Sequence, residues 1–167
     1  MRWFYPVAVA ILLLGGGSVA YKLTRGLRNK NPGNLKTNPL ANTWRGEIGA
    51  DGPFVVFNTF MNGFRALAIV ILRYPSKHNV KNLYELGHIY APPGDNKGAD
   101  NYGKNLSRQL GVSEKDALYA GYGIKGLIKA IVVNENGRIA ASLIPYTDED
   151  INSGIQWASD YTGIKVV

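Results

Sequence analysis

Apolar residues recur at the three- and four-residue spacing of amphipathic helices through most of the chain beyond residue 58. The longest such run begins after Thr59, which is suited to cap a helix, and we expect it to end at Tyr74 because Pro75 follows. The same spacing predicts helices over residues 80–90 and 125–135, and two more are predicted over residues 99–110, where Gly111 is a stop signal, and 148–159. Thr147 and Asp150 form the sequence signature of a capping box for the last helix.

Two short segments rich in β-branched and aromatic residues precede these helices. Residues 43–48 and 53–57 resemble half-buried strands, and the glycine-containing stretch between them predicts a turn. We interpret the two segments as the arms of a β-hairpin. The predicted fold class is therefore mainly α with a small β-hairpin, in one domain over residues 23–167.

Residues 22–36 are predicted to form a linker that contains a shaped turn. In the stretch Asn31-Pro32-Gly33-Asn34, proline fixes one backbone dihedral, while glycine and asparagine tolerate positive φ. This chemistry predicts a defined loop, although the loop's role is left open between a structural turn and part of a binding site.

Residues 3–21 contain no charged side chain. At ~1.5 Å per residue a helix of this length spans roughly 28 Å, close to the ~30 Å hydrocarbon core of a bilayer. Aromatic residues lie near both ends, as they do in membrane-spanning helices. We therefore predict a transmembrane anchor over residues 1–22, with its C-terminal side cytoplasmic because more cations follow it than precede it. The alternative is a cleaved signal peptide, since Ser18 and Ala20 present small residues before a possible cleavage site.

Composition narrows the possible chemistry. The 167 residues are 46% hydrophobic, which supports one folded domain with a real core. The chain has no cysteine, which excludes disulfides, thiolate zinc sites and cysteine nucleophiles. Only His78 and His88 are available as imidazole ligands, so we expect no metal site and no cofactor. The formal net charge of +7 suits an anionic polymer or surface, or a protein that is simply basic.

Glu135 is the most informative carboxylate in the sequence. It shares one predicted helix face with Ile128, Ile131 and Val132, at the end of an apolar stripe. Apolar neighbours and the negative end of the helix dipole both favour its protonated form, which a general acid for glycosidic cleavage requires. The alternative is a glutamate whose stem lies along the edge of the core while its head reaches water.

Other candidate residues have weaker support. Glu47 and Asp51 lie in or beside the predicted hairpin turn, where loop carboxylates are usually only solvated. Trp44, Tyr90 and Tyr102 could stack on sugar rings, although aromatic residues of a small helical domain more often belong to its core.

Five blocks of the sequence together resemble one known family. In chain order they read RGLRNKNPGNLK, WRGEIG, GPFVVFNTFMNGFRAL, IYAPPGDN with a later Tyr102, and LIKAIVVNENG. Their order and spacing from Arg25 to Gly137 resemble the lysozyme-like, peptidoglycan-degrading proteins of bacteriophage virions, which are muramidases or lytic transglycosylases. The predicted anchor is similar to those of the small membrane proteins of lipid-containing phages.

The resemblance implies a lysozyme-like α+β domain that cuts the β-1,4 bond between MurNAc and GlcNAc during genome entry. It implies a single-pass protein of the virion membrane, and of the inner membrane in the host. Its partners would be peptidoglycan glycan strands, the lipid bilayer and other virion proteins, with no specific nucleic acid. Glu135 corresponds to the family's catalytic acid, and Glu47 is our choice for the second carboxylate that a hydrolase needs. The implied substrate-binding residues are Asn31, Asn34, Trp44, Tyr90, Asp95, Asn96, Tyr102 and Asn136.

The sequence also departs from the family pattern. Asn134 replaces the usual histidine before the glutamate, Tyr90 replaces a tryptophan, and the usual Glu-Asn-x-Thr stretch has become Asp95-Asn96-Lys97-Gly98. These departures favour a second hypothesis, in which the domain is a non-catalytic structural protein that links the virion bilayer to the capsid.

Overall fold

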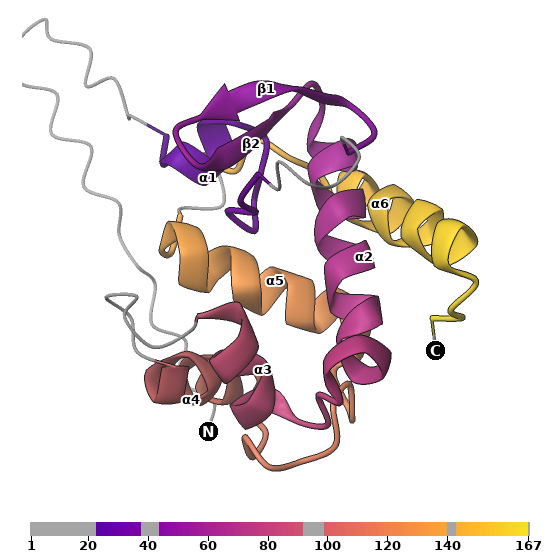
Figure 1. Cartoon of the computed structure of the whole chain (residues 1–167). Helices are drawn as coiled ribbons and strands as arrows, with labels where there is room; N and C mark the ends of the chain where they lie inside the picture. The colour runs from indigo at the N-terminus through magenta and orange to yellow at the C-terminus, as the bar shows by residue number, and fades with distance from the viewer. Residues whose placement is uncertain (1–22, 38–43, 92–98, 140–142, 167) are drawn as a thin grey trace, which may run out of the picture.

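The computed structural model of the chain describes residues 23–37, 44–91, 99–139 and 143–166. These residues form a mainly helical domain with one small antiparallel sheet (Figure 1). The helices are α1 (Arg25–Arg28), α2 (Phe60–His78), α3 (Leu83–Tyr90), α4 (Ala99–Leu110), α5 (Gly123–Asn136) and α6 (Asp148–Thr162), and the strands are β1 (Glu47–Asp51) and β2 (Phe54–Phe57). The predicted fold class, mainly α with a β-hairpin, is confirmed.

Helix α2 organises the domain. Figure 1 shows α6 on one side of α2 and the helices α3, α4 and α5 on the other, with the hairpin above. The main core is built from apolar side chains of all five of these helices. Its largest members are fully buried, among them Phe64, Leu67, Tyr102 and Leu127. Burial of this apolar surface is the dominant stabilising term of the fold.

The contact between α2 and α6 requires a glycine. A Cβ atom at Gly154 of α6 would lie 2.7 Å from Cβ of Phe64 and 2.8 Å from the backbone nitrogen of Arg65. Only a residue without a side chain permits this approach of the two helix backbones. Helix α6 begins with the predicted capping box, in which Thr147 accepts from the Asp150 amide and Asp150 accepts from the Thr147 amide.

The prediction that α2 ends before Pro75 was wrong. The helix continues to His78 with Pro75 inside its last turn, and Asn79 follows in the left-handed conformation. Pro75 has no N–H to donate to the carbonyl of Ile71, four residues earlier. The hydroxyl of Tyr119 donates to that carbonyl instead, at 3.0 Å. A partner from outside the helix thus satisfies the acceptor that the proline leaves open, which the local sequence could not reveal.

The other element boundaries shift by a few residues. The first strand lies at Glu47–Asp51 rather than at residues 43–48, so the hairpin turns at Gly52 and Pro53. Helix α3 begins at Leu83 instead of Val80, because Asn82 caps it by accepting from the Glu85 amide. A cap fixes a helix start more tightly than apolar spacing does.

The segment predicted as linker and turn is more ordered than expected. It contains the one-turn helix α1, and its continuation runs along the free edge of β2. The amide of Phe57 donates to Asn29, and that of Val55 donates to Leu35. Backbone pairing with β2 therefore fixes the position of the turn at residues 31–34.

None of the helices among the described residues is long and apolar enough to span a bilayer. The predicted anchor, residues 1–22, lies outside the described residues.

Candidate functional site

A cleft of about 570 Å³ opens between the turn at residues 31–34, β2, and the ends of α3 and α5. This volume is within the usual range for small-molecule sites. The lining is aromatic and apolar with a few polar groups: Gly33, Asn34, Leu35, Lys36, Phe54, Tyr74, Ile89, Tyr90, Ala91, Tyr102 and Glu135. Among the described residues that line the cleft, Glu135 is the only carboxylate.

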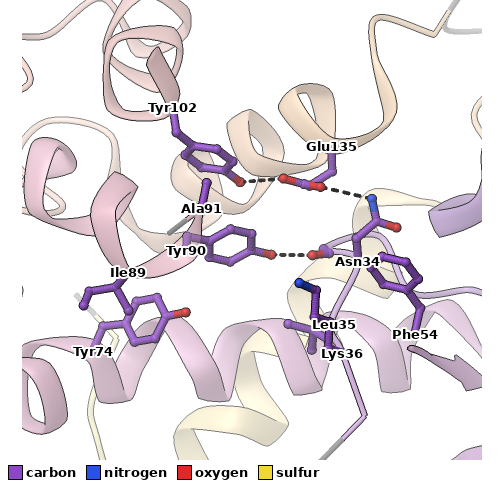
Figure 2. A pocket seen from close by; sticks show the side chains of 11 residues that line it. Asn34, Leu35, Lys36, Phe54, Tyr74, Ile89, Tyr90, Ala91, Tyr102 and Glu135 are labelled. Carbon is purple, nitrogen blue, oxygen red and sulfur yellow. Dashed lines mark hydrogen bonds between the residues drawn. The ribbon is translucent and has the colours of Figure 1, made fainter. Parts of the chain in front are cut away.

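Helix α5 carries Glu135 to the cleft in its last turn. The apolar residues on the same helix face are buried in the core, and their burial fixes the rotation of the helix about its axis. Glu135, at the end of this face, lies where the core meets the cleft. Figure 2 shows Tyr102 and Asn34 pointing at the carboxyl group from opposite sides. The Tyr102 hydroxyl donates to Oε1 at 2.9 Å, and the Asn34 amide donates to Oε2 at 3.0 Å. Both oxygens therefore have a fixed donor, and the carboxyl group has a defined orientation.

Three tyrosines that line the cleft stay protonated. Burial raises the pKa of Tyr102 and of Tyr90 well above the ordinary value, and the charge of Glu135 contributes to both shifts. Burial also raises the pKa of Tyr74 to about 12. Tyr102 therefore remains a donor to Glu135, and Tyr90 remains a donor to the Gly33 carbonyl, at any physiological pH.

The turn favours glycine at position 33 and asparagine at position 34 for different physical reasons. Asn34 has a φ of 50°, as predicted for this turn, whereas Gly33 is not among the described residues with positive φ. At Gly33 the need is space, because a Cβ atom would lie 2.7 Å from Leu67 and 2.8 Å from the Tyr90 hydroxyl. The glycine therefore lets Tyr90 dock on the turn.

Two predicted substrate-binding asparagines have structural partners instead of a place in the cleft. Asn31 is 1% exposed, and its amide donates to the carbonyls of Leu35 and Val55 at 2.9 Å. Asn136 is 6% exposed, and its amide donates to the carbonyls of Pro32 and Val132. Both residues hold the turn in place, and neither lines the cleft.

Trp44 and Glu47 also lie apart from the lining residues. Trp44 packs against both apolar clusters of the domain. Glu47 accepts from the backbone amide of Trp44 at 2.9 Å. The structure therefore does not bring Glu47 together with Glu135 in the cleft.

The remaining predicted residues are of two kinds. Tyr90, Tyr102, Asn34 and Glu135 all line the cleft, although they come from four separate parts of the chain. Asp95 and Asn96 lie outside the described residues.

Several lining residues were not expected from the sequence. Lys36 and Phe54 reach the cleft through the pairing of their segments, which was not predicted. Tyr74 belongs to the apolar pattern of α2, and that pattern does not separate a core residue from one at a cleft wall. Ile89 is 41% exposed in the structure, whereas an apolar residue in a helical pattern is expected in the core.

The cleft combines one oriented carboxyl group with aromatic walls. Such a group can donate or accept a proton at a bound molecule, and the tyrosine rings offer flat apolar surfaces for a ring-shaped substrate. No group of three or more His, Cys, Asp or Glu residues that could hold a metal occurs within the described part of the chain. The chemistry that the oriented carboxyl group of Glu135 can itself supply is proton transfer.

Comparison of the chain with protein-family models finds no match, and comparison with curated proteins finds no significantly similar sequence.

Proposed function

We propose that the domain is a lysozyme-like glycosidase that cuts the MurNAc–GlcNAc β-1,4 bond of peptidoglycan, as a lytic transglycosylase or a muramidase. The observation that carries this proposal is the oriented carboxyl of Glu135 in an aromatic cleft. An enzyme that cleaves a glycan needs such an acid next to the leaving oxygen, and flat apolar surfaces on which the sugar rings can pack.

In this mechanism Glu135 protonates the glycosidic oxygen as the bond to the anomeric carbon breaks. The resulting carboxylate then accepts a proton from the attacking hydroxyl group. Asn34 and Tyr102 hold the carboxyl group through both steps, one at each oxygen. Since the described lining holds no second carboxylate, we favour attack by a hydroxyl of the sugar itself, which is the transglycosylase reaction.

The proposed setting is a virion membrane, in which residues 1–22 form a single-pass anchor and the domain cuts the wall during genome entry. Arg25, Arg28 and Lys36 lie exposed in the segment that follows the anchor. Their charge supports a position near anionic headgroups and near other virion proteins.

The test is cleavage of purified peptidoglycan by the full chain in a neutral detergent, followed by separation of the soluble products. We expect muropeptide release by the wild type and at least about a hundredfold less by Glu135→Gln, since general acid–base catalysis is worth about 10²–10⁴. Glu47→Gln is the matched control and should retain activity. Products with an internal anhydro ring would identify a transglycosylase. A folded wild-type chain that releases no products from any peptidoglycan would overturn the proposal.

One observation favours the alternative, a non-catalytic structural protein of the virion membrane. Glu135 joins α5 to Tyr102 of α4 and to Asn34 of the turn, which is also what a purely structural carboxylate would do. In that case Glu135→Gln would lower the melting temperature while wild type and variant both lacked activity. An active wild type and an inactive variant that melts normally would exclude the alternative.

A further inference from the structure

Three arginines gather on the side of the domain away from the cleft. Arg65 and Arg73 of α2 lie against the ring of Tyr161, with their guanidinium carbons 4.8 and 5.3 Å from its centre. Arg45 lies 4.5 Å from the ring centre of Trp157. Both rings belong to α6, which packs on the face of α2 opposite α5 (Figure 1). We name these five residues the arginine cluster.

No carboxylate among the described residues pairs with these three arginines. None of the three arginines forms an ion pair or a side-chain hydrogen bond with any described residue. Other cations of the domain do have such partners: Arg28 pairs with Asp51, and Lys125 with Asp148. Because adjacent like charges repel, an anion bound between these arginines would stabilise them.

The unneutralised charge is energetically unfavourable above all at Arg65. This residue is only 8% exposed, and a buried charge is normally paired. Burial, followed by the nearby charge of Arg45, lowers the pKa of Arg65 below its ordinary value. Its nitrogens are not among the fully buried, unpartnered atoms of the described residues, so its N–H groups still reach solvent. An anion could therefore reach these donors beside Tyr161, which is itself 60% exposed.

We propose that the arginine cluster is a second binding site, separate from the cleft, that takes a phosphate group. Guanidinium groups bind phosphate oxygens through paired N–H donors, and several arginines around one position supply more donors than a carboxylate can accept. The rings of Trp157 and Tyr161 attract the guanidinium groups that lie against them and so help to keep these groups in place. The phosphate can come from free phosphate or from the headgroup of an anionic lipid, because the cluster also has the cation and aromatic content of a bilayer interface.

The test is NMR of the full chain in a neutral detergent, observed at the Trp157 indole and the arginine side chains. Inorganic phosphate is titrated at constant ionic strength, with chloride as the reference anion. We expect saturable shifts that Arg73→Gln and Arg45→Gln each weaken by about tenfold, the loss of one charge-assisted hydrogen bond. Arg65→Lys keeps the charge but removes the planar fork, so it should also weaken binding. Arg108→Gln, on α4 and remote from the cluster, is the matched control and should bind as the wild type does.

A second titration separates the two sources of phosphate. Dihexanoyl phosphatidylglycerol that binds more tightly than inorganic phosphate assigns the site to a lipid headgroup, and equal or weaker binding assigns it to free phosphate. The proposal is overturned if phosphate causes no saturable shift in the folded wild type. It is also overturned if both exposed variants, Arg45→Gln and Arg73→Gln, bind phosphate as the wild type does. Neither outcome depends on the activity of the cleft.

Discussion

Each oxygen of the Glu135 carboxyl has its own donor, and the two donors come from separate parts of the chain. Tyr102 is only 1% exposed as a residue, so its hydroxyl is held in a fixed position by the surrounding core. At the scale of single residues, the site therefore depends on how firmly a few side chains hold one carboxyl group in position.

Tyr102→Phe removes one of these donors and leaves the ring in place. We expect release of peptidoglycan fragments to be about 10- to 150-fold slower, because a hydrogen bond to a charged group contributes about 1.5–3 kcal/mol. Product release by wild type and variant is compared at equal folded concentration. Tyr84→Phe is the control, since Tyr84 does not line the cleft. Equal rates for all three chains would show that the Tyr102 hydroxyl does not orient the reacting group.

Asp51 gives a pH-dependent prediction. The amide of Asn29, and then the guanidinium of Arg28, holds the pKa of Asp51 below its ordinary value of 3.8. Because the folded-state pKa is depressed, ionised Asp51 stabilises the fold above the ordinary value, and this stability is lost as pH falls through the folded-state value. Asp51→Asn should therefore lower the melting temperature near neutral pH and have little effect in stronger acid. Thermal melts from about pH 7 to about pH 2 test this, and a pH-independent difference would contradict it.

At the scale of elements, contacts between distant segments supply hydrogen-bond partners that the local sequence does not provide. Pro75 interrupts the hydrogen bonding of α2, and Tyr119, in the loop before α5, supplies the missing donor to Ile71. In the same way β2 supplies backbone partners to the segment that contains Asn34. The elements are therefore stable because of their neighbours and not only because of their own sequences.

Tyr119→Phe should destabilise the domain by about 1–3 kcal/mol, because it leaves the buried carbonyl of Ile71 without its donor. In a Pro75→Ala background the helix regains its own N–H at that position, so the same change should cost less. Chemical unfolding of the four chains of this double-mutant cycle measures the coupling between the two sites. Strictly additive effects would show that the Tyr119 hydroxyl does not compensate for the proline.

At the scale of the whole molecule, the proposal combines a membrane segment, a catalytic cleft and a phosphate site. Helix α5, which carries Glu135 of the cleft, and helix α6, which carries Trp157 and Tyr161 of the arginine cluster, lie on opposite sides of α2 (Figure 1). The two sites share no residue, so both can be occupied at the same time. A domain with this arrangement could bind a phosphate-bearing surface on one side while the other side meets its substrate.

The anchor is tested by placing a charge at the centre of residues 3–21. Leu12→Arg should move the protein from the membrane fraction to the soluble fraction after alkaline carbonate extraction, because an arginine at mid-bilayer costs about 2.5–3.5 kcal/mol. Leu23→Arg, outside this stretch, is the control and should stay with the membranes. Wild type that is extracted by carbonate would contradict the anchor.

The helices could be predicted from the sequence because their signals are local. Apolar spacing, caps and stop signals located α2, α4, α5 and α6 to within a few residues, and Thr59 and Thr147 cap helices as expected. The position of Glu135 in the last turn of α5 follows from the same spacing. The predicted ends were less accurate at Pro75 and at the hairpin, where a distant donor and strand pairing decide the boundary.

The candidate site could be predicted only in part. Its four expected lining residues were identified one by one, but their association depends on the tertiary structure: Asn34 and Glu135 are 101 positions apart. The sequence by itself determined the helices, the caps and the acid at the end of an apolar stripe, since these arise from interactions within a few turns. The tertiary structure alone decided that Asn31 and Asn136 hold the turn and that Glu47 accepts from the backbone amide of Trp44. It alone decided that three arginines gather with no carboxylate partner in the part of the chain that the structure describes. These outcomes depend on which distant groups burial brings together, and no local pattern encodes that.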